Sequence, residues 1–161
     1  MKKADFMILA AVVLLVFSGI ACASDTIRIG LSAPITGNYA EYGENFKYSI
    51  TMAADKINAA GGLLGKKVEI LVMDSKGDPK EAALIAQKFV QDSSLVAELG
   101  DFTSTSCLAA APIYERGKMV QLSPTSSHPD FAKSGEYMFG IVGTQDAEGP
   151  FNVQYIAQEY M

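Results

Sequence analysis

Residues 67–99 read KVEILVMDSKGDPKEAALIAQKFVQDSSLVAEL, and this stretch decides the fold class. It opens and closes with apolar runs that have the length of buried strands. Between the two runs, Asp78 is placed to cap a helix, Pro79 suits the first helical position, and Glu81 stands where a capping box would close. The stretch therefore predicts a strand, a helix, and a second strand that pairs in parallel with the first.

The same alternation of strands and helices continues on both sides of this unit. Two of the expected helices carry an apolar stripe at helical spacing. The stripes consist of Phe46, Ile50, Ala53, Ala54 and Ile57 in the first helix, and of Ala82, Ile85, Ala86, Phe89 and Val90 in the second. We expect strands at 26–33, 67–73, 95–99, 120–122 and within 137–143, with further helices at 44–60, 104–116 and 146–161. Short connections between these elements predict an α/β fold, a doubly wound and mostly parallel sheet with helices on both faces.

The first 23 residues have the three parts of a secretory signal peptide. Two lysines are followed by an apolar run at 7–17, and small residues then end in Ala21-Cys22-Ala23. The apolar run is shorter than the ~20 residues that a membrane-spanning helix needs. We therefore predict that residues 1–23 are a signal peptide and that the mature protein is secreted. A retained N-terminal anchor and a lipid anchor on Cys22 stay open, although the leucine typical of a lipidation site is absent before Cys22.

Charge and cysteine content exclude several classes of function. The formal net charge is −5, and the lysines and arginines are scattered, whereas nucleic-acid-binding proteins need a concentrated positive face. Without the signal peptide, Cys107 is the only cysteine, so the mature chain forms no internal disulfide. Neither a cluster of zinc ligands nor the alternating oxygen ligands of a calcium loop is present. We expect no nucleic-acid partner, no metal and no cofactor.

Parallel sheets of this class bind ligands beyond the carboxyl ends of their strands, where the N-termini of helices also point. Ser104 stands at the start of an expected helix, where its hydroxyl either caps that helix or faces an anion together with free backbone N–H groups. Residues 123–127 (SPTSS) follow the next strand. Their composition is typical of a turn, but in that position they also offer hydroxyls and backbone groups of both polarities. The loops to inspect for a binding site are 34–42, 74–78, 101–103 and 123–128.

Four parts of the sequence together resemble the periplasmic binding proteins for branched-chain amino acids, the leucine/isoleucine/valine type of ABC importer. They follow one another in that family's order and spacing, and they cover nearly all of the expected mature chain. The segments are GLSAPITGNYAEYG at 30–43, DKINAAGGLLG at 55–65 followed by DSKGDP at 74–79, GDFTSTSCLAAAP at 100–112, and LSPTSSHP at 122–129.

The resemblance implies two α/β lobes that close on a ligand in the manner of a Venus flytrap. Residues 24–140 would form the first lobe, and residues 141–161 would form the crossover and the start of a truncated second lobe. The function implied is that of the extracytoplasmic solute-binding component of an ABC importer. Such a protein captures a branched-chain amino acid, or a related small carboxylate or amide, and delivers it to a permease in the inner membrane.

The resemblance also implies which side chains bind the ligand. The family's ligand serine falls on Ser104, whose hydroxyl would bind the ligand carboxylate. Thr125 and Ser127 would hold the α-amino and α-carboxylate groups, and a serine stands at 127 where these proteins often have threonine. Tyr42 would lie against the ligand side chain. Phe102 and Ser126 are expected to line the same cleft.

Two other functions are alternatives for this sequence, a hydrolase and a ligand-sensing domain. A hydrolase would need a nucleophile beside a base, and Cys107 and His128 are the only thiol and imidazole of the expected mature chain. Cys107 stands among leucine and alanine in an expected helix, which favours packing, and His128 is expected at the cleft rim without a chemical role. GGLLGKK at 61–67 lacks the spacing and element order of a phosphate loop. We therefore expect no enzyme activity, and a ligand-sensing domain of a receptor or regulator remains the alternative.

Overall fold

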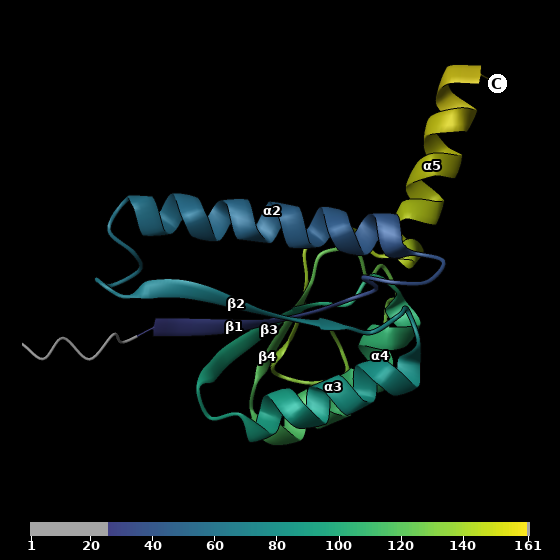
Figure 1. Ribbon diagram of the computed structural model, residues 1–161. Helices are drawn as coiled ribbons and strands as arrows, with labels where there is room; N and C mark the ends of the chain where they lie inside the picture. Colours follow the sequence, from purple (N-terminus) through teal and green to yellow (C-terminus); the bar gives the residue numbers. More distant parts are fainter. Residues whose placement is uncertain (1–25, 161) are drawn as a thin grey trace, which may run out of the picture.

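The computed structural model describes residues 26–160, which form one parallel sheet with helices on both of its faces (Figure 1). The sheet has five strands in the order β2-β1-β3-β4-β5, and every neighbouring pair is parallel. The predicted fold class is therefore confirmed. The strands are β1 (Thr26–Ala33), β2 (Lys67–Asp74), β3 (Leu95–Gly100), β4 (Val120–Ser123) and β5 (Met138–Gly140).

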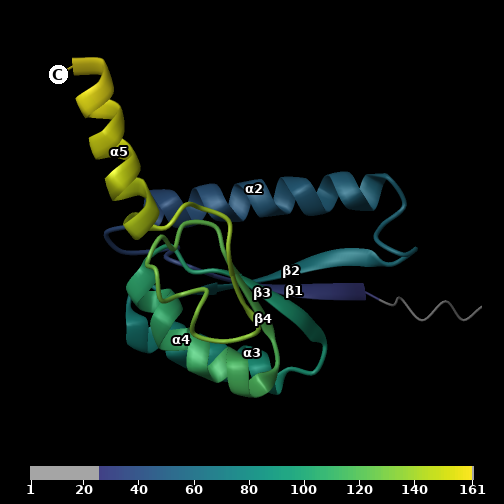
Figure 2. The same cartoon turned by 180° about the vertical axis from the view of Figure 1, so that it is seen from behind.

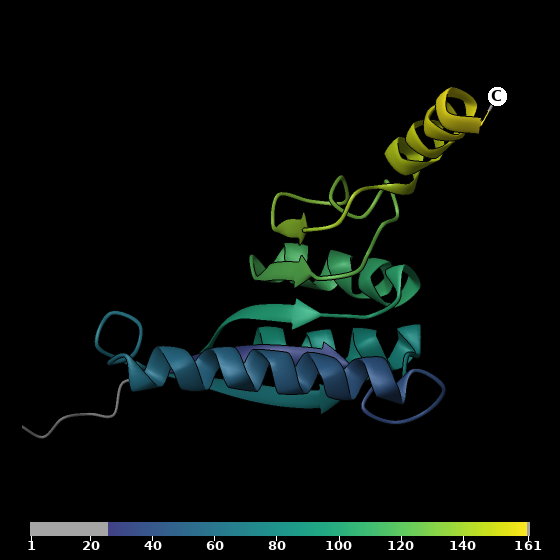
Figure 3. The same cartoon turned by 90° about the horizontal axis from the view of Figure 1, so that it is seen from above.

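Helix α2 (Ala40–Ala59) lies on one face of the sheet, and α3 (Pro79–Gln91) and α4 (Ser104–Gly117) lie side by side on the other (Figures 1 and 2). Helix α5 (Gln145–Tyr160) points away from the sheet, and all its side chains are exposed (Figure 3). The chain runs from β1 to β2 on one side and then returns to β3 on the other side of β1. The strand order therefore reverses beside β1, which is where sheets of this class form their binding crevices.

The core lies between the sheet and the α3–α4 layer. Phe89 of α3 and Tyr114 of α4 are both essentially inaccessible to solvent. Gly30 of β1 permits this packing, because a Cβ atom there would lie 2.5 Å from the Phe89 ring. The stripe predicted for α3 is confirmed at Ala82, Ile85, Ala86 and Phe89, whereas Val90 is half-buried.

Helix α2 differs from the prediction at its start and in its burial. It begins at Ala40 rather than Glu44. Its N-cap residue, Tyr39, makes no side-chain hydrogen bond to the first turn, so the sequence carries no capping signal for this start. Of the stripe predicted for this helix, only Ala54 is buried. Ile57 remains 39% exposed because α2 lies over β1 and β2 and leaves part of the sheet uncovered.

The remaining elements agree with the expected ranges within a few residues. The strand expected within 137–143 is limited to Met138–Gly140, which pairs with β4 alone. The predicted signal peptide and Cys22 fall outside the described residues. No helix within residues 26–160 combines the length and the apolar character that a membrane span requires.

Candidate functional site

The loops that follow β1, β2, β3 and β4 leave the sheet at the same edge, because all these strands run in the same direction (Figure 3). This edge therefore collects the four loops that the sequence marked for inspection. The N-termini of α3 and α4 open at the same edge, since each of these helices directly follows one of the loops.

The two helix N-termini differ in what they leave free. At α3, the Asp78 carboxylate accepts hydrogen bonds from the amides of Lys80 (2.7 Å) and Glu81 (3.2 Å), so the predicted cap is confirmed. The predicted capping box is wrong, because the Glu81 carboxylate pairs with Lys76 Nζ at 3.6 Å and the Asp78 amide donates to the Ser75 carbonyl. A carboxylate of the chain itself thus occupies the positive end of α3.

At α4, the cap is Thr103 rather than Ser104. Thr103 Oγ1 accepts a hydrogen bond from the Ser106 amide at 3.1 Å and donates to Ser106 Oγ at 2.9 Å. The interpretation of Ser104 as the cap is therefore wrong, because the helix takes its cap from the preceding hydroxyl residue. Ser104 is half-buried, and its hydroxyl has no hydrogen-bond partner within the described residues. The amides of Ser104 and Thr105 belong to the first turn, which has no preceding carbonyls to bind.

The loops after β3 and β4 contact each other directly. Thr125 Oγ1 donates a hydrogen bond to the Phe102 carbonyl at 2.8 Å. Ser126 is 3% exposed, and within the described part of the chain its hydroxyl has no partner. The Ser127 carbonyl accepts a hydrogen bond from the Gln145 amide at 2.9 Å, while its hydroxyl and amide have no partner among the described residues. Ser104 and Ser127 each lie two residues beyond the Thr125–Phe102 contact, and their joint role stays a prediction.

Aromatic side chains gather around Phe102. Tyr42 of α2 stacks on it with ring centroids 4.2 Å apart and planes 17° from parallel. Tyr39 and Phe46 also pack on this ring, at centroid distances of 5.2 and 6.1 Å. Tyr42 and Phe102 were predicted from the sequence as site residues, whereas the other two rings were not. Their spacing of three and four residues from Tyr42 is the signal, because such residues share one face of a helix.

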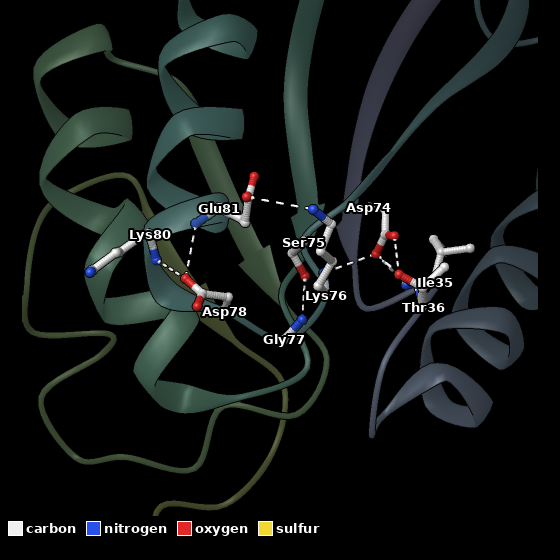
Figure 4. A network of polar contacts seen from close by, with 9 residues as sticks. All are labelled: Ile35, Thr36, Asp74, Ser75, Lys76, Gly77, Asp78, Lys80 and Glu81. Carbon is white, nitrogen blue, oxygen red and sulfur yellow. Dashed lines mark hydrogen bonds and ion pairs between the residues drawn. The ribbon is translucent and has the colours of Figure 1, made fainter.

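Asp74, at the end of β2, holds the loop between β1 and α2 in place (Figure 4). Its carboxylate accepts hydrogen bonds from the amides of Ile35 (2.9 Å) and Lys76 (2.9 Å), and from both the amide and the hydroxyl of Thr36. Burial alone would raise the pKa of Asp74, but these hydrogen bonds outweigh it and lower the pKa. The anchored loop carries Tyr39 and leads into α2, so Asp74 helps to hold Tyr39 and the start of α2 in position beside the Phe102 ring.

The thiol and the imidazole offer no nucleophile–base pair. Cys107 is fully buried, and its Sγ lies 3.4 Å from both Ser123 Oγ and the Asp101 carbonyl. Burial raises the pKa of this thiol to about 12, although the hydrogen bond with Ser123 acts in the opposite direction. His128 Nδ1 accepts a hydrogen bond from the Asp130 amide at 3.2 Å. The packing interpretation of Cys107 is confirmed, and within residues 26–160 no three His, Cys, Asp or Glu side chains gather as a metal site would require.

Sequence reasoning also missed Asp101, which is 1% exposed and lies in the loop between β3 and α4. Burial raises the pKa of its carboxyl, while hydrogen bonds from Ser75, Phe102 and Ser32 offset part of that rise. The only signal in the sequence was its place between a glycine and a hydroxyl-rich helix start.

The sequence profile of a family described as "Periplasmic binding protein" matches residues 26–160, which are all of the described residues. The chain belongs to this family. It is 33% identical over 152 residues to the leucine-, isoleucine-, valine-, threonine- and alanine-binding protein of Pseudomonas aeruginosa, covering 94% of this chain and 40% of that protein. It is 30% identical over 153 residues to the Leu/Ile/Val-binding protein of Escherichia coli, covering 94% and 41%. The chain thus spans about two fifths of the length of these periplasmic binding proteins.

Solved structures agree with this assignment. A protein assigned to branched-chain amino acid ABC transport in Rhodospirillum rubrum is 40% identical, with a TM-score of 0.76 over 84% of this chain and 39% of that one. The branched-chain amino acid transporter substrate-binding protein of Streptococcus pneumoniae, solved in complex with isoleucine, is 29% identical. Its TM-score is 0.77 over 83% of this chain and 38% of that one. The five-stranded parallel sheet with its flanking helices therefore matches the type I periplasmic binding protein fold.

Proposed function

We propose that this chain supplies the carboxylate-binding half of a solute site in the substrate-binding protein of an ABC importer. The observation that carries the proposal is the Ser104 hydroxyl at the positive N-terminus of α4, which has no hydrogen-bond partner among residues 26–160. It follows a loop that contacts the β4 loop through the 2.8 Å Thr125–Phe102 hydrogen bond. A helix N-terminus combines orphan N–H donors with about half a positive charge, which suits a carboxylate. Helix α3 offers no such site, because Asp78 already occupies its N-terminus.

The other predicted residues complete the recognition of a zwitterionic ligand. The hydroxyls of Ser126 and Ser127, together with the Ser127 amide, add polar groups from the β4 loop, and Thr125 fixes that loop against Phe102. The exposed face of Tyr42, which is 49% accessible, and the neighbouring Phe102 ring give the ligand side chain an apolar surface. These groups fit a branched-chain amino acid or a related small carboxylate or amide.

The complete protein works, in this proposal, by closure of two lobes. Residues 24–140 form the first lobe, and residues 141–161 lead into a second one, in keeping with the two fifths of its relatives that the chain spans. Ligand binds the first lobe, and the second lobe then closes on it because the closed state binds the ligand more tightly. The closed protein docks on an inner-membrane permease from the periplasm, whether free or held by a lipid on Cys22.

The test is Ser104→Ala in the protein produced from its complete natural gene, with L-leucine and L-isoleucine as probes in titration calorimetry. Loss of a hydrogen bond to a charged group costs about 1.5–3 kcal/mol, or roughly 10- to 150-fold in affinity. The matched control is Ser49→Ala, which removes an exposed serine hydroxyl from α2 and should leave the affinity unchanged. An unchanged affinity in Ser104→Ala would remove this residue from the site.

A further inference from the structure

Asp101 makes polar contacts with the ends of several of the strands that border the candidate site. Its carboxylate accepts hydrogen bonds from Ser32 Oγ at the end of β1 (3.1 Å) and from the Phe102 amide in its own loop. The Ser75 hydroxyl after β2 and the Thr103 amide also lie close enough to lower the pKa of this carboxyl. These donors come from three different strand–loop junctions. The side chain of one buried residue therefore ties together the ends of β1, β2 and β3.

The backbone carbonyl of Asp101 makes the connection to β4. It accepts a hydrogen bond from Ser123 Oγ at 3.2 Å and lies 3.4 Å from Thr125 Oγ1, the longer arm of the hydrogen bond that this hydroxyl donates to the Phe102 carbonyl. Ser123 Oγ in turn accepts a hydrogen bond from the Ser126 amide at 3.0 Å. The loop that carries Ser126 and Ser127 is thus held against the same residue that orders the start of α4.

A close approach of two backbones makes this arrangement possible. Gly100 has φ +134°, and a Cβ atom there would lie 2.0 Å from the Ser32 carbonyl. Only glycine fits at that position, because both the conformation and the space exclude a side chain. Gly100 therefore lets the β3–α4 loop pass close to β1 and brings the Asp101 carboxylate within reach of Ser32.

We propose that Asp101 is a positioning residue of the ligand site, which sets the relative position of the Ser104 loop and the Ser127 loop. The inference rests on the proposed function. Asp101 accepts the hydrogen bond of the Phe102 amide and lies close to the Thr103 amide, so the free amides that face a ligand begin at Ser104. It thereby determines both the distance between the two loops and which donors the ligand meets. Hydrogen bonds to a carboxylate are stronger than those between neutral groups, so this single side chain can hold the two loops in position.

The experiment compares Asp101→Asn with Asp92→Asn in the protein produced from its complete natural gene, again with L-leucine in titration calorimetry. Asp92 is the matched control, because it also accepts an amide hydrogen bond (from Ser94, 3.0 Å) but follows α3 at the opposite edge of the sheet. We expect Asp101→Asn to weaken binding at least 10-fold and Asp92→Asn to change it less than twofold. Both variants are also followed by urea unfolding, so that a loss of affinity is separated from a loss of stability.

A double-mutant cycle of Asp101→Asn and Ser104→Ala measures the coupling of the two residues in ligand affinity. If Asp101 had a purely structural role, this coupling would be absent. If Asp101 acts through the Ser104 loop, the double variant binds more tightly than the product of the two single losses predicts. Should Asp101→Asn not fold, Ser32→Ala removes one donor from the carboxylate without touching either loop, and we expect it to weaken binding several-fold. An affinity within twofold of the wild type in Asp101→Asn or Ser32→Ala, or losses that simply multiply, would overturn the inference alone. Absence of amino-acid binding by the wild-type protein would overturn the proposed function together with it.

Discussion

The two faces of the sheet are covered to different extents. Between the sheet and the α3–α4 layer lies a closed core that includes Phe89, Tyr114 and Phe131. On the other face, α2 covers only part of the sheet and leaves two apolar pockets that share Ile50 and Leu99. The first is also lined by Ile29, Ile57, Val68 and Ile70 among others, and the second by Leu122, Pro124 and Ile141.

An amphipathic pattern identifies the side of a helix that faces the sheet, but not how deeply that side is buried. The stripes of α2 and α3 both identify the side that faces the sheet, but only the stripe of α3 is nearly all buried. The pattern does not report how many neighbours the helix has, because burial is decided by what packs beside it. The ends of β3 and β4, which lead into two loops of the candidate site, are anchored in the closed face, since Cys107 and Ser123 are buried there beside Asp101.

The largest difference between the two faces should appear in the free energy of unfolding. Phe89→Ala removes a 1%-exposed ring from the closed core and should cost about 3–5 kcal/mol. Ile57→Ala removes a 39%-exposed side chain from the open face and should cost less than about 1.5 kcal/mol. Urea unfolding at constant pH measures both. An equal loss at Ile57 would show that the α2 face is as well packed as the other one.

A second difference is electrostatic. Glu98 of β3 is fully buried, and neither of its carboxylate oxygens has a hydrogen-bond partner among the described residues. Burial first, and then the charge of Asp101, raise the pKa of Glu98 well above its ordinary value, and the nearby Ser32 backbone offsets only part of this rise. The folded protein therefore keeps a proton that the unfolded chain releases, so stability is lost as the pH rises above about 4.3, the ordinary pKa of a glutamate.

Glu98→Gln should raise the free energy of unfolding at pH 7.5 by about 1–3 kcal/mol and flatten its dependence on pH between 5 and 7.5, because the amide needs no proton to stay neutral. Urea titrations at pH 5, 6 and 7.5 measure the slope. Glu69→Gln is the control, since Glu69 is exposed and its ion pair with Arg28 at 3.6 Å contributes little. A wild-type stability that rises with pH, or a slope unchanged in Glu98→Gln, would contradict this assignment.

The fold was largely predictable from the sequence, and the site only in part. The start of α3 could be placed to the residue because Asp78 and Pro79 form a local signal, whereas α2 begins without one. Tyr42, Phe102 and Thr125 stand near the predicted strand ends, and the structure brings them into contact. The contacts of Asp101 could not be foreseen, because its neighbours come from separate strand ends and each is an ordinary serine, threonine or backbone amide in the sequence.

The smallest expected effect concerns how the helices of the closed face begin. Helices α3 and α4 each start on a capping side chain, Asp78 and Thr103, whereas α2 has none. Thr103→Ala leaves the Ser106 amide without its 3.1 Å acceptor and should lower the free energy of unfolding by about 1 kcal/mol. Ser104→Ala should change that free energy by less than about 0.5 kcal/mol, because its hydroxyl makes no hydrogen bond within the described chain. Urea unfolding of the two variants without ligand separates the roles. A loss at Ser104 as large as that at Thr103 would return Ser104 to the capping role and weaken its case as a ligand group.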